Sequence, residues 1–289
     1  MNMQVEYLIK KALDFEAQGK PLHALQVYLE IIEIDSVFPQ TYAKLASLYE
    51  KLRNPERAFE LLHDYLDNIQ EDTELRLLLG QMLIKYSDWK AASEVLMFFP
   101  VEEQPIVQFF LGYANYMSGD YELSKLNLER FILTNPESEL LSESYITLAK
   151  NNIAMELYDE ALENLEKASG QFKDNWEIHK LSGMIYYNKG MYLHSATSME
   201  KAISLNPAEN TLFELAGKAY LKLADYENAK KNLLKCVSVS EPSSETYTCL
   251  GLVYLNTRNI IDASNYFDMA LTLDPMNEVA LDGKKKCNS

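Results

Sequence analysis

A small residue returns along the whole chain at a nearly constant spacing, and this period restricts the fold more than any other feature. The eight positions are Ala24, Ala58, Ala92, Ser124, Ala161, Ser195, Ala229 and Ala263. The spacings are 34, 34, 32, 37, 34, 34 and 34 residues. A period of roughly 20 to 50 residues is typical of solenoids and other repeat arrays, in which each repeat is one supersecondary unit.

A second column of small residues lies twelve positions before the first. Its members are Ala12, Ala46, Gly80, Gly112, Ala149, Gly183, Gly217 and Gly251. Glycine inside a helix costs about 1 kcal/mol relative to alanine, so these glycines need a packing reason. A close crossing of two helices supplies one, because a larger side chain there would overpack the contact. Each repeat is therefore predicted to be a helix, a tight turn and a second helix.

The composition supports an all-α fold and gives no sign of a nucleic-acid partner. Only 10 Gly and 9 Pro occur in 289 residues, too few for a turn-rich β fold. The formal net charge is −16, and the only compact basic run is 284–286. Phosphate binding depends on clustered Lys and Arg, so this charge pattern disfavours nucleic acid.

Candidate metal, redox and membrane features are weak. Three cysteines, Cys236, Cys249 and Cys287, have no CxxC spacing and indicate free thiols in a reducing compartment. Four scattered histidines lack partners at ligand spacing, so no metal or other cofactor is expected. Apolar stretches at 95–101 and 106–117 are too short and interrupted to span a bilayer. We expect a cytoplasmic protein with no membrane insertion.

The turns and helix ends resemble those of the tetratricopeptide repeat family. The resemblance rests on the two small-residue columns, the turn Gly119-Asp120-Tyr121, and the prolines Pro207 and Pro275 that close the second helix. It implies an all-α, right-handed α-α superhelix of about eight helical hairpins in a single domain over 1–289. The expected repeats are 5–38, 39–72, 73–104, 105–138, 142–175, 176–209, 210–243 and 244–277, followed by a cap helix and tail at 278–289.

The resemblance also implies where a partner binds. In the family the first helix of each hairpin lines a concave face that usually holds a peptide or a helix. The residues that correspond to this face in repeats 4 to 7 are Phe109, Tyr113, Tyr116, Ile146, Lys150, Lys180, Met184, Tyr187, Lys218 and Lys222. Aromatic residues and Met are favoured at interface cores. We expect a groove for an extended or helical segment with apolar and acidic residues; alternatively, the strip packs against a terminus of the chain itself.

Two functions remain after this reading, and a third is disfavoured. A protein–protein interaction scaffold or adaptor is favoured by the architecture. A self-assembling solenoid that forms homo-oligomers is the alternative. An enzyme is not expected, since no nucleophile–base pair or cofactor fingerprint is present. The carboxylate clamp of heat-shock co-chaperones is also not expected, because only Lys180 matches it and Met184 replaces an asparagine.

The array is not uniform along its length. Position 27 of the repeat is Ile31, Tyr65, Phe99 and Phe131 in the first four repeats, and Ala168, Ala202, Cys236 and Ala270 in the last four. The irregular spacings of 32 and 37 residues bracket the fourth repeat, which also contains Pro100 and Pro105. We therefore predict a seam near 99–141, different superhelical pitches on its two sides, and the best binding surface beside it.

Overall fold

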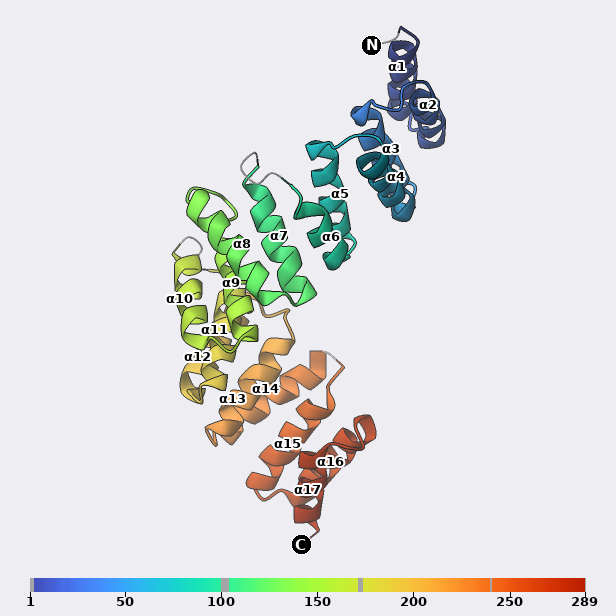
Figure 1. Cartoon of the computed structure of the whole chain (residues 1–289). Helices are drawn as coiled ribbons and strands as arrows, with labels where there is room; N and C mark the ends of the chain where they lie inside the picture. The colour runs from blue at the N-terminus through green and yellow to red at the C-terminus, as the bar shows by residue number, and fades with distance from the viewer. Residues whose placement is uncertain (1–2, 100–103, 171–173, 240, 289) are drawn as a thin grey trace. The chain divides into compact units, whose positions relative to one another are not determined.

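The computed structural model describes residues 3–99, 104–170, 174–239 and 241–288, and within these ranges every regular element is an α-helix (Figure 1). The helices are α1 (Met3–Ala17), α2 (Pro21–Ile34), α3 (Pro39–Lys51), α4 (Pro55–Asn68), α5 (Thr73–Lys85), α6 (Trp89–Leu96), α7 (Ile106–Ser118), α8 (Tyr121–Thr134), α9 (Leu141–Ala154), α10 (Tyr158–Ser169), α11 (Trp176–Asn188), α12 (Tyr192–Leu205), α13 (Thr211–Lys222), α14 (Tyr226–Val239), α15 (Ser244–Asn256), α16 (Ile260–Leu273) and α17 (Glu278–Cys287). The predicted all-α repeat fold is confirmed, and each expected repeat contains one helix pair.

The chain forms two compact units. The first runs over Met1–Ser138 and contains α1 to α8, and the second runs over Glu139–Ser289 and contains α9 to α17. Their boundary falls inside the interval 99–141, where the spacing of the repeats is irregular. Within each unit, consecutive helices pack as hairpins, and hydrophobic clusters join each hairpin to the next. This nearest-neighbour packing is the general way in which solenoids bury their cores.

The glycines of the small-residue column lie where the two helices of a hairpin approach most closely. A Cβ built on Gly217 would lie 2.5 Å from Cγ of Leu233, and one built on Gly112 would lie 2.6 Å from Cγ of Leu128. The predicted close crossing is confirmed. In both cases the large side chain comes sixteen residues after the glycine, so the small residue makes room for that side chain.

Every hairpin turn contains one residue in the left-handed region of backbone conformation. These residues are Gly19, Arg53, Ser87, Gly119, Glu156, Gly190, Ala224 and Arg258. In several turns the next residue caps the second helix, as where Oδ1 of Asp120 accepts a hydrogen bond from the Leu123 amide at 3.3 Å. Such a cap satisfies an N–H group that the helix leaves unpaired. The turn therefore has a fixed length, which keeps the two small-residue columns twelve residues apart.

The two irregular spacings have separate local causes. Helix α6 is only 8 residues long, which shortens the third repeat. The segment 135–140 between α8 and α9 lengthens the next spacing. Pro105 precedes the first residue of α7, whereas Pro100 lies outside the described residues.

Position 27 differs between the units in what it contacts. In the first unit the Tyr65 hydroxyl donates a hydrogen bond to the Val37 carbonyl at 3.3 Å, and its ring lies 4.4 Å from that of Tyr42. In the second unit Ala270 leaves room for the Ser244 hydroxyl, which donates to the Ala270 carbonyl at 3.0 Å. A difference in pitch between the units stays a prediction.

Candidate functional site

The ten residues predicted to line the groove divide between the two units. Phe109, Tyr113 and Tyr116 belong to the first unit, and the other seven belong to the second. In the first unit Phe109 is buried and packs 5.7 Å from the Phe131 ring, so it is a core residue. Tyr113 and Tyr116 are half-buried on α7, where Tyr113 meets the Trp89 ring edge-on at 5.7 Å.

Ile146 is a core residue, so its assignment to an exposed strip was wrong. Its side chain is 1% exposed and lies in a hydrophobic cluster with Leu165 of α10 and Ile178 of α11. The cause is the packing of α10 and α11 against α9, which covers this position. Spacing along one helix does not reveal how far adjacent helices cover it.

The four lysines do not form an uncompensated basic strip. Lys150 pairs with Glu177 at 2.8 Å, and Lys218 pairs with Glu214 at 2.6 Å and with Glu245 at 2.8 Å. The Lys180 ammonium lies 5.7 Å from the centroid of the Trp176 ring. Lys222 is exposed. Carboxylates of the chain therefore already pair with two of the four lysines that were expected to attract acidic residues of a partner.

Three of the predicted residues line an open groove in the second unit. Tyr187, Lys218 and Lys222 border a cavity of about 740 Å³. Helices α11, α13, α15 and α17 and the ends of α14 and α16 contribute the rest of its lining, namely Leu221, Tyr226, Ser243, Ser244, Glu245, Thr248, Cys249, Leu252, Asn256, Asp274, Asn277 and Val279. We call this cavity the main groove. Its volume lies within the range of small-molecule and peptide side-chain sites.

A smaller cavity of about 220 Å³ adjoins the main groove. Tyr187, Lys218 and Glu245 line both cavities. The smaller one, the side pocket, is otherwise lined by Met184, Asn188, Ser195, Met199 and Leu215. The structure therefore brings four predicted residues together, Met184, Tyr187, Lys218 and Lys222, around two adjacent cavities.

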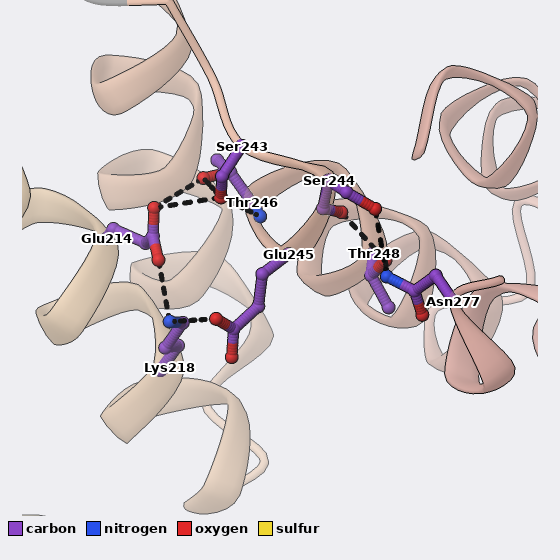
Figure 2. A network of polar contacts seen from close by, with 8 residues as sticks. All are labelled: Glu214, Lys218, Ser243, Ser244, Glu245, Thr246, Thr248 and Asn277. Atoms are coloured by element: carbon purple, nitrogen blue, oxygen red, sulfur yellow. Dashed lines mark hydrogen bonds and ion pairs between the residues drawn. The ribbon is translucent and has the colours of Figure 1, made fainter. Parts of the chain in front are cut away.

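A polar network joins α13 to α15 at the border of the main groove (Figure 2). The Glu214 carboxylate accepts hydrogen bonds from the Thr246 hydroxyl at 2.6 Å and the Ser243 hydroxyl at 3.3 Å, and pairs with Lys218. Ser243 also caps α15 by accepting from the Thr246 amide at 3.0 Å. Glu214 is thus fixed from three sides, and α13 is tied to the first turn of α15.

Helix α15 is in turn tied to α17 by Asn277 (Figure 2). The Asn277 side-chain amide donates to the Ser244 hydroxyl at 2.9 Å and to the Thr248 hydroxyl at 3.0 Å. Its carbonyl oxygen caps α17 by accepting from the Ala280 amide at 3.0 Å. Helix α17 is therefore more than the expected cap, since its first turn forms one side of the main groove.

Burial and pairing set the protonation states in the groove. Burial opposes ionisation of Glu214, but the hydrogen bonds from Lys218 and Thr246 outweigh it and lower the pKa of Glu214. Burial likewise opposes the charge of Lys218, yet Glu214 and Glu245 together raise the pKa of Lys218. Burial raises the pKa of the Cys249 thiol to about 12, so this cysteine stays protonated near neutral pH.

The sequence did not lead us to predict the glutamates that pair with the lysines or the residues that join α13, α15 and α17. It does contain a pattern that indicates the ion pairs. In both pairs a lysine of one repeat is followed 27 residues later by a glutamate of the next, as in Lys150 with Glu177 and Lys218 with Glu245. A constant offset between opposite charges indicates a contact between consecutive repeats. Asn277 offered no comparable pattern.

Among the residues that the structure describes, no group of three or more His, Cys, Asp or Glu side chains is placed to hold a metal ion. No helix in the described ranges is both long and apolar enough to cross a membrane.

Comparison with known proteins identifies the repeat. The tetratricopeptide repeat family model matches residues 181–209 and 211–242, which cover α12, α13, α14 and residues 181–188 of α11. No curated protein sequence matches the chain significantly.

Solved structures share the fold at low sequence identity. A chain of the APC/C hetero-tetramer Cut9–Hcn1 has a TM-score of 0.61 and 16% identity, over 98% of this chain and 55% of that one. A tetratricopeptide repeat protein from Parabacteroides merdae ATCC 43184 has a TM-score of 0.54 and 16% identity over 100% of both chains. YrrB, described as a TPR protein with an unusual peptide-binding site, has a TM-score of 0.56 and 16% identity over 64% of this chain and 95% of its own.

These likenesses concern the fold, and the chain spans only about half of the Cut9–Hcn1 chain. The family match identifies residues 181–209 and 211–242 as tetratricopeptide repeats, and the remaining helix pairs form the same kind of hairpin.

Proposed function

We propose that the chain is a protein-interaction scaffold that binds a segment of a partner protein in the main groove and the side pocket. The observation that carries this proposal is the pair of adjacent cavities, of about 740 and 220 Å³, on the second unit. Both have walls made by helices of consecutive repeats, so the fold supplies a rigid surface. Rigid binding surfaces lose less entropy on association than flexible ones.

The side pocket has the chemistry of an anchor site. Met184, Met199 and Leu215 give it an apolar lining, and methionine adapts readily to different apolar side chains. Ser195 also lines it, and the Ser195 hydroxyl is fully buried without a hydrogen-bond partner among the described residues. Because that hydroxyl is covered, the accessible part of the pocket favours an apolar side chain of the partner.

The comparisons agree with this class of function without defining the partner. YrrB is described as having an unusual peptide-binding site. A peptide-binding role for the present chain is our proposal, which rests on its own cavities. Apolar side chains of the partner segment should contribute most to its binding, since Lys150 and Lys218 already pair with carboxylates of the chain.

The half-buried aromatic residues of α7 are a second proposed contact surface. Tyr113 and Tyr116 are partly exposed on the first unit, and Met117 beside them is exposed. Tyr, Trp and Met are enriched at protein interfaces. Their contribution would be additional to that of the cavities on the second unit.

Truncation of two lining residues tests the proposal. The double variant Met184→Ala, Tyr187→Ala should lose most partner recovery in an affinity purification read out by mass spectrometry. The matched control is Tyr186→Ala, because Tyr186 lies on the same helix but packs against His194 at 5.4 Å and does not line either cavity. Undiminished recovery of all partners by a folded double variant would refute groove binding.

Self-assembly remains the alternative because α1 exposes large apolar side chains. Met3 is 85% exposed and Tyr7 is 66% exposed, and exposed apolar faces favour association. Light scattering of the wild type and of the variant Met3→Ser, Tyr7→Ser distinguishes the two functions. Oligomers that grow with concentration and disappear in the variant would favour assembly, whereas a monodisperse monomer would favour the scaffold.

A further inference from the structure

The charges that line the main groove are not balanced once its ion pairs are considered. Two lysines, Lys218 and Lys222, face two lining carboxylates, Glu245 and Asp274, and Glu214 lies behind Lys218. Lys218 is enclosed, with carboxylate oxygens at 2.6 and 2.8 Å from its ammonium nitrogen. The positive charge of Lys218 is therefore directed at the protein's own carboxylates. With Glu214 included, three carboxylates stand against Lys218 and the exposed Lys222.

The carboxylates that remain accessible lie at the edge of the groove. The Glu245 side chain is 65% exposed, whereas that of Lys218 is 15% exposed. Glu245 contacts Lys218 through Oε2, and its Oε1 points away from Lys218 (Figure 2). Asp274 at the end of α16 is also exposed. Glu245 is thus held in place by one oxygen and presents the other to an incoming group.

The aromatic lining has the same preference for positive charge. Tyr187 and Tyr226 both border the main groove, and the face of an aromatic ring attracts ammonium and guanidinium groups. The chain itself contains this contact elsewhere, since the Lys230 ammonium lies 4.7 Å from the centroid of the Tyr254 ring. Burial raises the pKa of Tyr187, which keeps that ring neutral.

Apolar side chains border the same groove. Leu221, Leu252 and Val279 contribute to its lining, so a bound segment has apolar surface to cover close to the two carboxylates. A purely basic segment would leave these side chains exposed to water. The combination favours a segment in which basic and apolar residues lie close together.

We infer that the occupant of the main groove is a basic, apolar segment of another protein, in which an Arg or Lys pairs with Glu245 and Asp274 while neighbouring apolar side chains cover Leu221, Leu252 and Val279. This inference rests on the proposed function and reverses the acidic partner expected from the lysines alone. The net charge of −16 adds to the local preference, because it attracts cationic segments at a distance.

Selection from a library of random dodecapeptides displayed on phage supplies the probe. The full chain is the bait, and the enriched peptides are then synthesised and titrated by fluorescence anisotropy. Peptides should be enriched in Arg or Lys beside apolar residues, and their affinity should fall about tenfold for the variant Glu245→Gln, Asp274→Asn. The matched control is Glu177→Gln, which removes a carboxylate in the same register, paired with Lys150, but outside both cavities.

The outcomes separate the inference from the proposed function. Enriched peptides that are acidic, or that bind Glu245→Gln, Asp274→Asn as tightly as the wild type, would overturn the inference and leave groove binding intact. If no peptide is enriched, or if the enriched peptides bind Met184→Ala, Tyr187→Ala unchanged, groove binding itself is wrong, and the inference falls with it. Circular dichroism of each variant confirms that loss of binding is not loss of fold.

Discussion

At the scale of single residues, the first column of small residues, which begins at Ala24, shows how one position serves two purposes. It is Ala in six repeats and Ser in two. The Ser124 hydroxyl donates to the Gly112 carbonyl at 2.7 Å, which ties the two helices of that hairpin together. The Ser195 hydroxyl has no partner among the described residues and lines the side pocket. The same residue type therefore joins two helices in one repeat and lacks a side-chain partner in the other.

Replacing each serine by alanine should separate these roles. Ser124→Ala should lower the free energy of unfolding by about 1 kcal/mol, because a buried hydrogen bond is lost. Ser195→Ala should leave that free energy unchanged or raise it, since a buried hydroxyl without a partner is removed. Urea denaturation of both variants measures the difference. Equal losses in the two variants would show that Ser195 is also a structural donor.

The carboxylate of Glu214 should make the second unit sensitive to acid. Burial opposes its ionisation, but bonds from Lys218 and Thr246 hold its pKa below that of an unfolded chain. A lowered pKa contributes stability above the unfolded value of about 4.3, and this contribution is lost as pH falls through the folded value. Urea denaturation should thus find Glu214→Gln less stable than the wild type at pH 7, and this difference should become smaller as pH falls below 4.3. A difference that does not change with pH would contradict this account.

At the scale of helices, capping residues connect elements as well as end them. Asn277 caps α17 and at the same time donates to the Ser244 and Thr248 hydroxyls of α15. Asn259 caps α16 by accepting from the Asp262 amide at 3.3 Å, and the side-chain bonds of Asn259 within the described residues stay inside that first turn. The two asparagines have the same local role, but only the first fixes the position of a second helix.

Substitution of the two caps by alanine should therefore have unequal effects. Each loses a cap worth about 1 kcal/mol, and Asn277→Ala also leaves the Ser244 and Thr248 hydroxyls without that donor. Hydrogen exchange should show reduced protection throughout α17 in Asn277→Ala, and only at the start of α16 in Asn259→Ala. Full protection of α17 in the first variant would mean that Gly283, packed against Phe267, fixes this helix without the hydrogen bonds.

At the scale of the whole molecule, destabilisation should stay within the unit where it is introduced. Gly217→Val would place its side chain against Leu233, and overpacking of this kind costs about 1–3 kcal/mol. Because repeats contact only their neighbours, hydrogen exchange should increase in helices of the second unit and stay unchanged in α1 to α8. Gly80→Val, against Leu96, should give the reverse pattern. Loss of protection in both units from either variant would show that they unfold as one.

The length of the repeat and the positions of its helix pairs follow from local features of the sequence. Fixed turn length and the room needed opposite residues such as Leu233 are local requirements, so they leave a period in the sequence that can be read directly. The same holds for the buried alanines of the second helix and for the place of α17. The change of position 27 from Phe131 to Ala168 coincides with the boundary between the units, and it too was visible in the chain.

Which side chains of the array remain accessible depends on the packing of helices from different repeats. Ile146 is buried because α10 and α11 cover it, and Lys218 is neutralised because Glu245 of the next repeat reaches it. Both outcomes depend on distances between helices, which a pattern along one helix does not contain. The repeat length follows from local spacing along the chain, whereas the charge and shape of the proposed binding surface arise where separate repeats meet.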